Sequence, residues 1–178
     1  KLSERDLAIC NVEEPMCIAG VFGGEGSGTY ETTCNVLLES AYFNPTWIRK
    51  SARRHGLSTD ASFRFERGID PNGVIYALKQ AAMMCKELAG GEIAMEIKDV
   101  YPQPIADFIV DLNYDYAYGL MGKNIGMDTV KSIVTSLEMK ILEETTEGLK
   151  LQVPAYRVDV QRPCDVVEDI LRVYGYNN

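Results

Sequence analysis

The sequence predicts an α+β fold made of two modules, and two patterns lead to this prediction. Capped helices alternate with short strand-like runs in residues 1–104, whereas a helix, a hairpin and a second helix follow in residues 105–178. Between them, residues 101–104 form a proline-bearing connector. With 178 residues, the chain is long enough to bury a core, either as one domain or as two small ones.

The helices of the first module are predicted from the residues at their ends. Asn44 and Pro45 are typical of an N-cap and a first helical position, and Gly56 is typical of the residue after a last turn. A helix over 45–55 is therefore expected. An Asp-Pro pair and a later Gly-Gly pair bound a second helix, expected over 70–88. Five segments have the character of strands: 7–10, 16–22, 36–39, 92–100 and 107–112.

The second module has a simpler pattern. A helix is expected over 128–138, because its apolar residues recur at helical spacing. Two strands, 140–142 and 149–153, form a hairpin around residues 145–148, and a last helix is expected over about 166–174.

The charge of the chain excludes some classes of partner. The net charge is −8, of which residues 1–104 carry −3 and residues 105–178 carry −5. A general nucleic-acid binder needs a positive surplus, so neither module is expected to be one, and no specific DNA partner is expected. Residues 49–67 are a local exception, with six basic residues against two acidic ones. A solvated helix face with ion pairs is the alternative interpretation of that run.

Several further features bear on location. No apolar run approaches the roughly 18–20 residues of a membrane span, and the first residues do not form a signal peptide, so no membrane partner is expected. The five cysteines are an odd number without a C-x-x-C pair, which is typical of free thiols in a reducing cytoplasm. The chain lacks an initiating Met and is expected to be a fragment. The single histidine, His55, is expected to cap a helix C-terminus.

The glycine-rich run over residues 20–29 does not match a nucleotide-binding motif. A phosphate-binding P-loop would need a lysine where Thr29 stands, and the dinucleotide-binding pattern lacks its last glycine. Two interpretations stay open. The run is a loop that needs positive φ angles and close backbone approach, or its backbone N–H groups hold a ligand carboxyl or carbonyl.

Three longer runs form a specific pattern. They are LLESAYFNP over 37–45, RRHGLSTDAS over 53–62 and RFERGIDP over 64–71. This pattern strongly resembles the editing domain of the beta chain of bacterial phenylalanyl-tRNA synthetases. The segment IAGVFGG over 18–24 is similar to the Gly-Gly segment of that family, with Phe22 where a Met is usual. The runs VPAYRVD over 153–159 and DVVED over 165–169 resemble the family's next module.

The resemblance implies the following organisation. Residues 1–104 are expected to be the C-terminal part of a mixed α/β editing (tRNA-binding) domain, and residues 105–178 a small winged-helix-like module. The family's enzymes are heterotetramers of two alpha and two beta chains that charge tRNA(Phe) with phenylalanine. ATP is used by the whole enzyme and is not expected to bind this fragment.

The resemblance also implies a site that hydrolyses tyrosine wrongly attached to tRNA(Phe). Glu39 matches a carboxylate that accepts the tyrosine hydroxyl, Thr59 and Ala61 match residues that line the same pocket, and Gly23 and Gly24 match its glycine wall. No residue is an obvious general base, so a water positioned by backbone groups and the tRNA ribose is expected. The isolated fragment is expected to show little or no hydrolysis.

A tRNA-facing basic patch is expected at Arg49, Arg53 and Arg54. An alternative interpretation of Glu39, without the resemblance, is a rim residue or an ion-pair partner of Arg53 or Arg54.

Four carboxylates of the second module form a candidate metal site. They are Asp159, Asp165, Glu168 and Asp169, the last where the family usually has Glu. Hard oxygen ligands without a nearby basic group suit Mg²⁺, and the resemblance implies one Mg²⁺ shared with the alpha chain. The alternative is a capping box from Asp165 to Glu168 at the helix start, and this is expected to dominate in the isolated fragment.

Two other functions stay open. The chain is a non-catalytic scaffold and tRNA-facing module that subunit assembly requires, or an unrelated acidic interaction domain.

Overall fold

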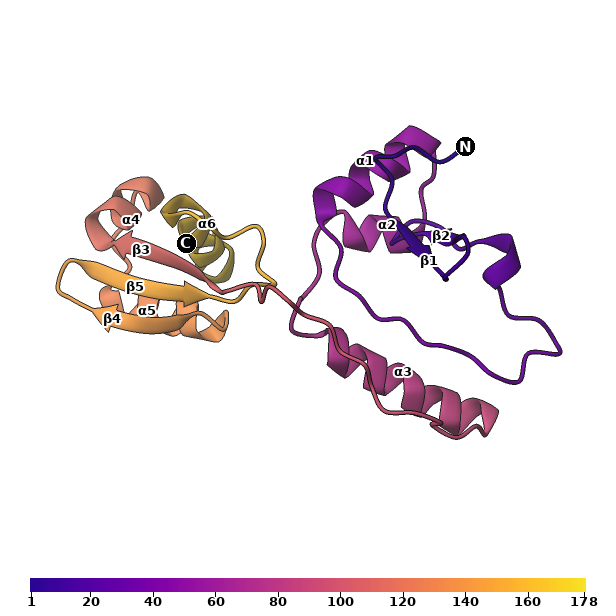
Figure 1. Ribbon diagram of the computed structural model, residues 1–178. Helices are drawn as coiled ribbons and strands as arrows, with labels where there is room; N and C mark the ends of the chain where they lie inside the picture. The colour runs from indigo at the N-terminus through magenta and orange to yellow at the C-terminus, as the bar shows by residue number, and fades with distance from the viewer. The chain divides into compact units, whose positions relative to one another are not determined.

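The computed structural model describes residues 1–178 and divides into two compact units, residues 1–101 and residues 102–178 (Figure 1). Both units contain helices and antiparallel strands, so the predicted α+β class is confirmed. None of the helices combines the length and the apolar character needed to cross a membrane.

The first unit contains a two-stranded sheet and three α-helices. Its elements are β1 (Ala8–Cys10), β2 (Pro15–Ile18), the 3₁₀ helix η1 (Glu25–Ser27), α1 (Pro45–His55), α2 (Asp60–Phe65) and α3 (Val74–Ala89). Strands β1 and β2 pair in antiparallel fashion. An extended segment, residues 28–44, joins η1 to α1 (Figure 1).

Helix α1 has the bounds that the sequence predicts. The side chain of Asn44 accepts hydrogen bonds from the backbone N–H groups of Thr46 and Trp47, which satisfies donors that have no partner inside the helix. Gly56 ends the helix in the left-handed region, at a φ of 63°. Local capping chemistry therefore marks both ends of this element, while Ile48 and Ala52 pack it into the core.

Other expectations for the first unit are wrong. The second predicted helix, α3, begins at Val74, because the Asp70 carboxylate accepts a hydrogen bond of 2.8 Å from Asn72 N–H and forms a turn before the helix. Residues 36–39 and 92–100 form no strand, since neither segment has a partner strand. Helix α2, whose N-cap is Thr59, has no counterpart among the elements predicted from the sequence.

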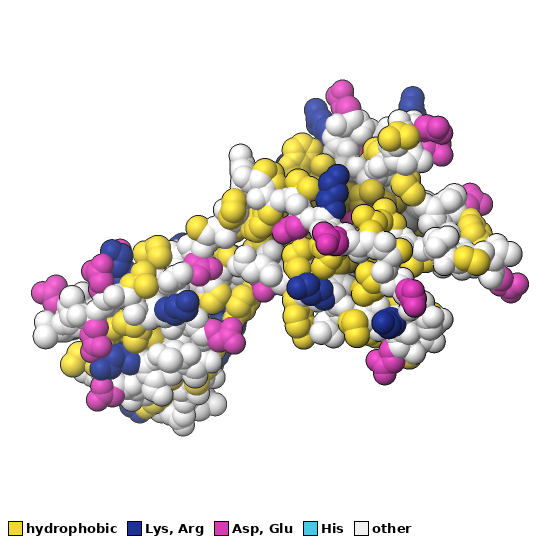
Figure 2. All heavy atoms as spheres, turned by 60° about the horizontal axis from the view of Figure 1, so that its bottom comes forward, with side chains coloured by type: hydrophobic (Ala, Val, Ile, Leu, Met, Phe, Trp, Pro, Cys, Tyr) yellow, Lys and Arg dark blue, Asp and Glu magenta, His cyan; other side chains and the backbone are white.

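The core of the first unit is small. Three buried residues, Val21, Ile48 and Ala52, form its centre, and Phe43 and Phe65 pack against it with ring centroids 5.1 Å apart. Helix α3 has no buried residue. Hydrophobic side chains therefore lie on the surface of this unit, as Figure 2 shows on the face that it presents.

The second unit has a three-stranded antiparallel sheet in the order β3-β5-β4 and three helices (Figure 1). Its elements are β3 (Phe108–Asn113), α4 (Tyr114–Met121), α5 (Met127–Ser136), β4 (Lys140–Glu144), β5 (Gly148–Val153) and α6 (Pro163–Tyr174). The predicted hairpin, its preceding helix and the strand over 107–112 are confirmed, within a few residues at each end.

The central strand of this sheet explains the core of the second unit. Leu149, Leu151 and Val153 alternate along β5, so all three point to one face, and each is at most 3% exposed. They belong to a cluster of fifteen buried residues contributed by every element except β4. Burial of this cluster holds α6 and the sheet together.

Candidate functional site

The glycine segment lies beside a shallow pocket of the first unit. A tight turn precedes it, with Ile18 and Phe22 exchanging two backbone hydrogen bonds of 2.9 and 3.1 Å. The pocket has a volume of about 200 Å³. Its lining comes from β2, the turn and the chain start: Leu2, Pro15, Met16, Cys17, Ile18, Phe22, Gly23 and Gly24.

The two glycines of the predicted wall are required for different reasons. A Cβ on Gly24 would lie 1.8 Å from the carbonyl oxygen of Met16, so only glycine allows this backbone approach. A Cβ on Gly23 would meet no atom within 4 Å. The close-approach interpretation of the glycine run therefore applies to Gly24, whereas Gly23 faces open space.

Thr59 connects the glycine segment to α2. Its hydroxyl donates a hydrogen bond of 2.6 Å to the carbonyl of Val21, two residues before Gly23, and accepts one of 3.0 Å from Ser62 N–H. The Thr59 hydroxyl therefore both donates and accepts a hydrogen bond within the fold. Ala61 follows in the first turn of α2, and its side chain is exposed.

Glu39 lies in the extended segment before α1 and does not line the pocket. Its carboxylate makes no hydrogen bond or ion pair, so the alternative of a pair with Arg53 or Arg54 is wrong. Partial burial raises the pKa of the Glu39 carboxyl above its usual value. Its neighbour Ser40 is fixed by a 2.9 Å hydrogen bond to the carbonyl of Val74 at the start of α3.

The predicted basic patch divides into two parts. Arg49 and Arg53 are exposed on α1 and free to meet a partner. Arg54 instead forms an ion pair with Asp6, whose side chain is only 1% exposed. All three arginines are exposed, but only Arg54 is engaged in an ion pair with a buried carboxylate.

Asp6 is the centre of a polar cluster that no motif in the sequence indicates. Its carboxylate accepts a 2.9 Å hydrogen bond from the Ser51 hydroxyl and lies 2.7 Å from His55 Nε2. Burial raises the pKa of Asp6, but hydrogen bonds from Ser3 N–H, His55 and Ser51 and the charge of Arg54 outweigh it and hold that pKa well below its usual range. His55 thus has a specific carboxylate partner beyond the expected helix terminus.

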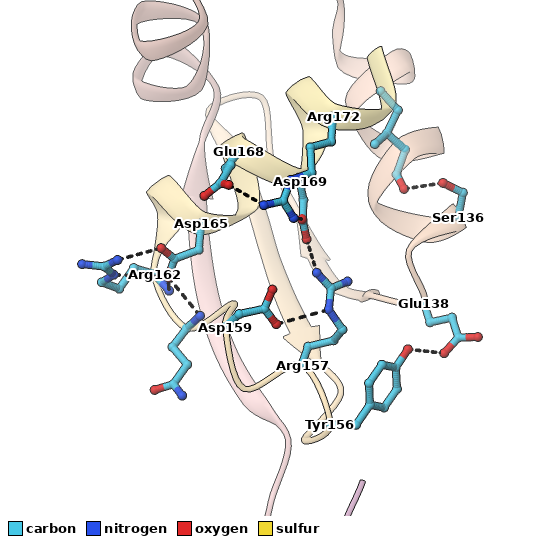
Figure 3. Close-up of polar contacts among 12 residues, drawn as sticks. Ser136, Glu138, Tyr156, Arg157, Asp159, Arg162, Asp165, Glu168, Asp169 and Arg172 are labelled. Carbon is cyan, nitrogen blue, oxygen red and sulfur yellow. Dashed lines mark hydrogen bonds and ion pairs between the residues drawn. The ribbon is translucent and has the colours of Figure 1, made fainter. Parts of the chain in front are cut away.

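The four carboxylates of the second unit lie among arginines (Figure 3). Arg157 pairs with Asp169 and, through Nε at 3.6 Å, with Asp159. Arg172 contacts Glu168 at 2.6 Å and Asp169 at 3.3 Å. The expectation that no basic group lies near these carboxylates is therefore wrong.

Asp165 has a capping role different from the predicted one. It is the third residue of α6 and not its N-cap, because the helix begins at Pro163. Its carboxylate accepts hydrogen bonds from the backbone N–H groups of Gln161 and Arg162, at 3.2 and 2.9 Å. The side chain of Arg162 contacts it at 2.8 Å, and this hydrogen bond, with those from the backbone, lowers the pKa of Asp165 far below its usual value.

This donor set does not fit a divalent cation as the chain stands. No group of three or more His, Cys, Asp or Glu residues is placed to hold a metal ion. Asp169 is buried, at 4% exposure, and each of its two oxygens accepts from an arginine. A shared Mg²⁺ at these positions stays a prediction.

Two family models match the chain, and together they define its class as tRNA-synthetase modules. One is described as "B3/4 domain" and matches residues 1–90, and the other as "tRNA synthetase B5 domain" and matches residues 110–176. The chain belongs to the B3/4 domain family and carries a B5 domain after it.

Curated relatives narrow this class to one kind of subunit. The chain is 71% identical over its full length to the phenylalanine–tRNA ligase beta subunit of Bacteroides fragilis and 70% identical to that of Bacteroides thetaiotaomicron. It is 47% identical over 99% of its length to the same subunit of Porphyromonas gingivalis. The resemblance found in the sequence is confirmed. The chain spans 22% of the length of each of these relatives.

Proposed function

We propose that this chain is part of the beta subunit of a phenylalanine–tRNA ligase, an ATP-dependent enzyme that charges tRNA(Phe) with phenylalanine and works in the cytoplasm. Its first unit contributes to hydrolysis of tyrosine wrongly attached to that tRNA. The observation that carries the hydrolytic role is the pair of glycines beside the pocket. Gly24 fixes the backbone against Met16, and Gly23 leaves space in front of it.

A second site is physically useful for this enzyme. An apolar pocket rejects an analogue that merely adds a hydroxyl only weakly, roughly 100-fold. A site that requires the hydroxyl reverses the selection, because phenylalanine would leave a desolvated acceptor without a partner. An editing site therefore needs an acceptor that has no partner inside the protein.

Glu39 has the properties of such an acceptor. Glu39 is exposed, and its carboxylate makes no hydrogen bond or ion pair within the chain, so it is accessible to a donor from a ligand. Partial desolvation already raises its pKa, and binding of a ligand would desolvate it further. Its backbone is held close to α3 by the bond from Ser40 to Val74. The tyrosine hydroxyl is the donor proposed for it.

Thr59 acts on the glycine wall in this proposal rather than on the substrate. Its hydroxyl is engaged by Val21 and Ser62, which fixes the turn that leads into Gly23. None of the residues that line the pocket carries a carboxylate or an imidazole. A water held by backbone groups and the tRNA ribose is therefore the proposed nucleophile. Ala61 remains a proposed pocket residue, and the exposed Arg49 and Arg53 are proposed to face the bound tRNA.

The test is hydrolysis of tyrosine-charged tRNA(Phe) by the complete alpha/beta enzyme with Glu39→Ala. We expect hydrolysis to fall at least about tenfold while charging with phenylalanine persists, because the hydroxyl loses its acceptor. Glu31→Ala is the matched control, since Glu31 is an exposed acid of the same extended segment. Unchanged hydrolysis in Glu39→Ala would remove Glu39 from the site.

A scaffold role is the second candidate, and the independent core of the second unit favours it. In this proposal residues 102–178 contact the alpha chain within the tetramer of two alpha and two beta chains. Deleting the unit should then abolish the tetramer on size-exclusion chromatography. A tetramer that assembles normally without the unit would contradict the scaffold role.

A further inference from the structure

The loop between β5 and α6 places an arginine side chain among the carboxylates of the second unit. Arg157 lies in this loop, and its guanidinium points to α6, where it pairs with Asp169 (Figure 3). Its Nε lies 3.6 Å from Asp159 on the same loop. The side chains of Arg157 and Asp169 are 18% and 6% exposed, so the charges meet largely away from water.

Packing of the backbone sets the position of this guanidinium. Arg157 N–H donates a 2.9 Å hydrogen bond to the carbonyl of Pro154, and its own carbonyl accepts one of 3.1 Å from Val160 N–H. Ala155 and Val160, on either side of Arg157, are buried at 3% and 1% exposure. The loop is therefore anchored in the core at both ends of the segment that carries Arg157.

The acceptor is anchored equally well. Asp169 lies on α6, near the buried residues Val167 and Ile170 in sequence, and its own side chain is only 6% exposed. Its second oxygen accepts from Arg172 at 3.3 Å. Both carboxylate oxygens of Asp169 are thus occupied by guanidinium groups, and a metal ion would have to displace them.

We propose that Arg157 is the resident cation of this module: it joins Asp159 and Asp169, clamps the loop onto α6 and makes the folded unit independent of a divalent metal. Removing the guanidinium leaves the buried Oδ2 of Asp169 without a partner, while Oδ1 keeps only the 3.3 Å contact with Arg172. A buried carboxylate that loses its closer ion-pair partner is strongly destabilising. The same carboxylates are then open to a divalent cation, which is the hard-ligand type that they suit.

The test uses the 178-residue chain and follows its thermal unfolding by the loss of amide hydrogen-exchange protection in β5 and α6. The temperature at which half of this protection is lost is the unfolding midpoint of the second unit. For the wild type, this midpoint should be the same in 10 mM MgCl₂, in EDTA and in NaCl of matched ionic strength. Arg157→Met should lower the midpoint of the second unit by at least about 10 °C, and MgCl₂ should restore part of that loss. Arg162→Met is the matched control, because Arg162 pairs with Asp165 from a side chain that is 73% exposed, and its midpoint should change little.

An internal reference comes from Trp47, the only tryptophan of the chain, which lies in the first unit. Its fluorescence transition should not change in Arg157→Met, because the substituted residue lies in the other unit.

Three results would overturn the proposal. They are a wild-type midpoint that rises in MgCl₂ beyond the matched salt, an Arg157→Met midpoint like that of Arg162→Met, and a destabilised Arg157→Met that gains nothing from MgCl₂. If Arg157→Met does not fold, the double variant with Asp169→Leu decides. Recovery towards the wild-type midpoint supports the clamp, because the unpaired charge is gone, and no recovery contradicts it.

Discussion

The two units differ sharply in how much of their apolar surface they bury. The second unit, residues 102–178, has a core cluster of fifteen buried residues, whereas the cluster of the first unit, residues 1–101, has three. In the first unit Leu37, Leu88 and Val100 are 75–85% exposed. The second unit therefore specifies its fold from its own residues, while the first carries apolar surface that its own fold does not cover.

This difference also separates the kinds of site that each unit offers. The glycine segment and Glu39 of the first unit have open space and an unpaired acceptor, which are features of a surface that meets another molecule. The carboxylates of the second unit are satisfied internally by arginines. A polar group that is already paired contributes to the fold, whereas an unpaired one is available to a ligand.

The largest expected effect tests the contrast in burial. Leu151→Ala removes a side chain that is fully buried in the second unit, and it should lower the free energy of unfolding by about 2–5 kcal/mol. Leu88→Ala on α3, where Leu88 is 79% exposed, should change it by less than about 0.5 kcal/mol. Urea unfolding followed by circular dichroism measures both. Equal losses would mean that α3 is packed in solution, and the contrast would be wrong.

A smaller effect sharpens the distinction between the two glycines. Gly24→Ala places a Cβ against the Met16 carbonyl and should lower the stability of the first unit by about 1–3 kcal/mol. Gly23→Ala fills open space and should cost less than about 0.5 kcal/mol. Trp47 fluorescence during urea unfolding measures both variants. A Gly23→Ala variant as unstable as Gly24→Ala would show that Gly23 is also needed for the fold.

The smallest effect concerns the pH dependence of the first unit. The folded pKa of Asp6 lies below its unfolded value of about 3.9, so its contribution to stability is complete above that value and is lost as pH falls below it. Thermal midpoints from Trp47 fluorescence should therefore drop by a few degrees between pH 5 and pH 3. Asp6→Asn should have a lower midpoint at pH 7 and a flatter profile. An unchanged profile in the variant would assign the acid sensitivity to other groups.

Local signals in the sequence predicted the elements that local chemistry defines. Helix α1 follows from Asn44, Pro45 and Gly56, all within a few residues of its ends. Residues 92–100 have the character of a strand, but a strand needs a partner for its backbone groups, and none is present. Local character therefore gives the tendency of a segment and not its pairing.

The contacts that organise the Arg157–Asp169 pair and the Asp6 cluster could not be predicted from the sequence. Arg157 stands 12 residues before Asp169, and Asp6 stands 49 residues before His55. No spacing rule connects charges that the fold brings together from separate elements. Only the family resemblance indicates the motif residues Glu39, Thr59 and Gly23. In the structure, the Thr59 hydroxyl is hydrogen-bonded within the fold, whereas Glu39 has no hydrogen-bond partner and Gly23 faces open space.

The hydroxyl of Thr59 has a consequence for how the first unit is assembled. One oxygen atom starts α2 and holds the carbonyl of Val21, which is 38 residues earlier in the chain. A six-residue helix is too short to persist alone in water, so α2 depends on tertiary contacts such as this hydrogen bond to Val21. The stability of α2 and that of the turn before the glycine segment are therefore coupled, and a substitution that loosens one of them weakens the other.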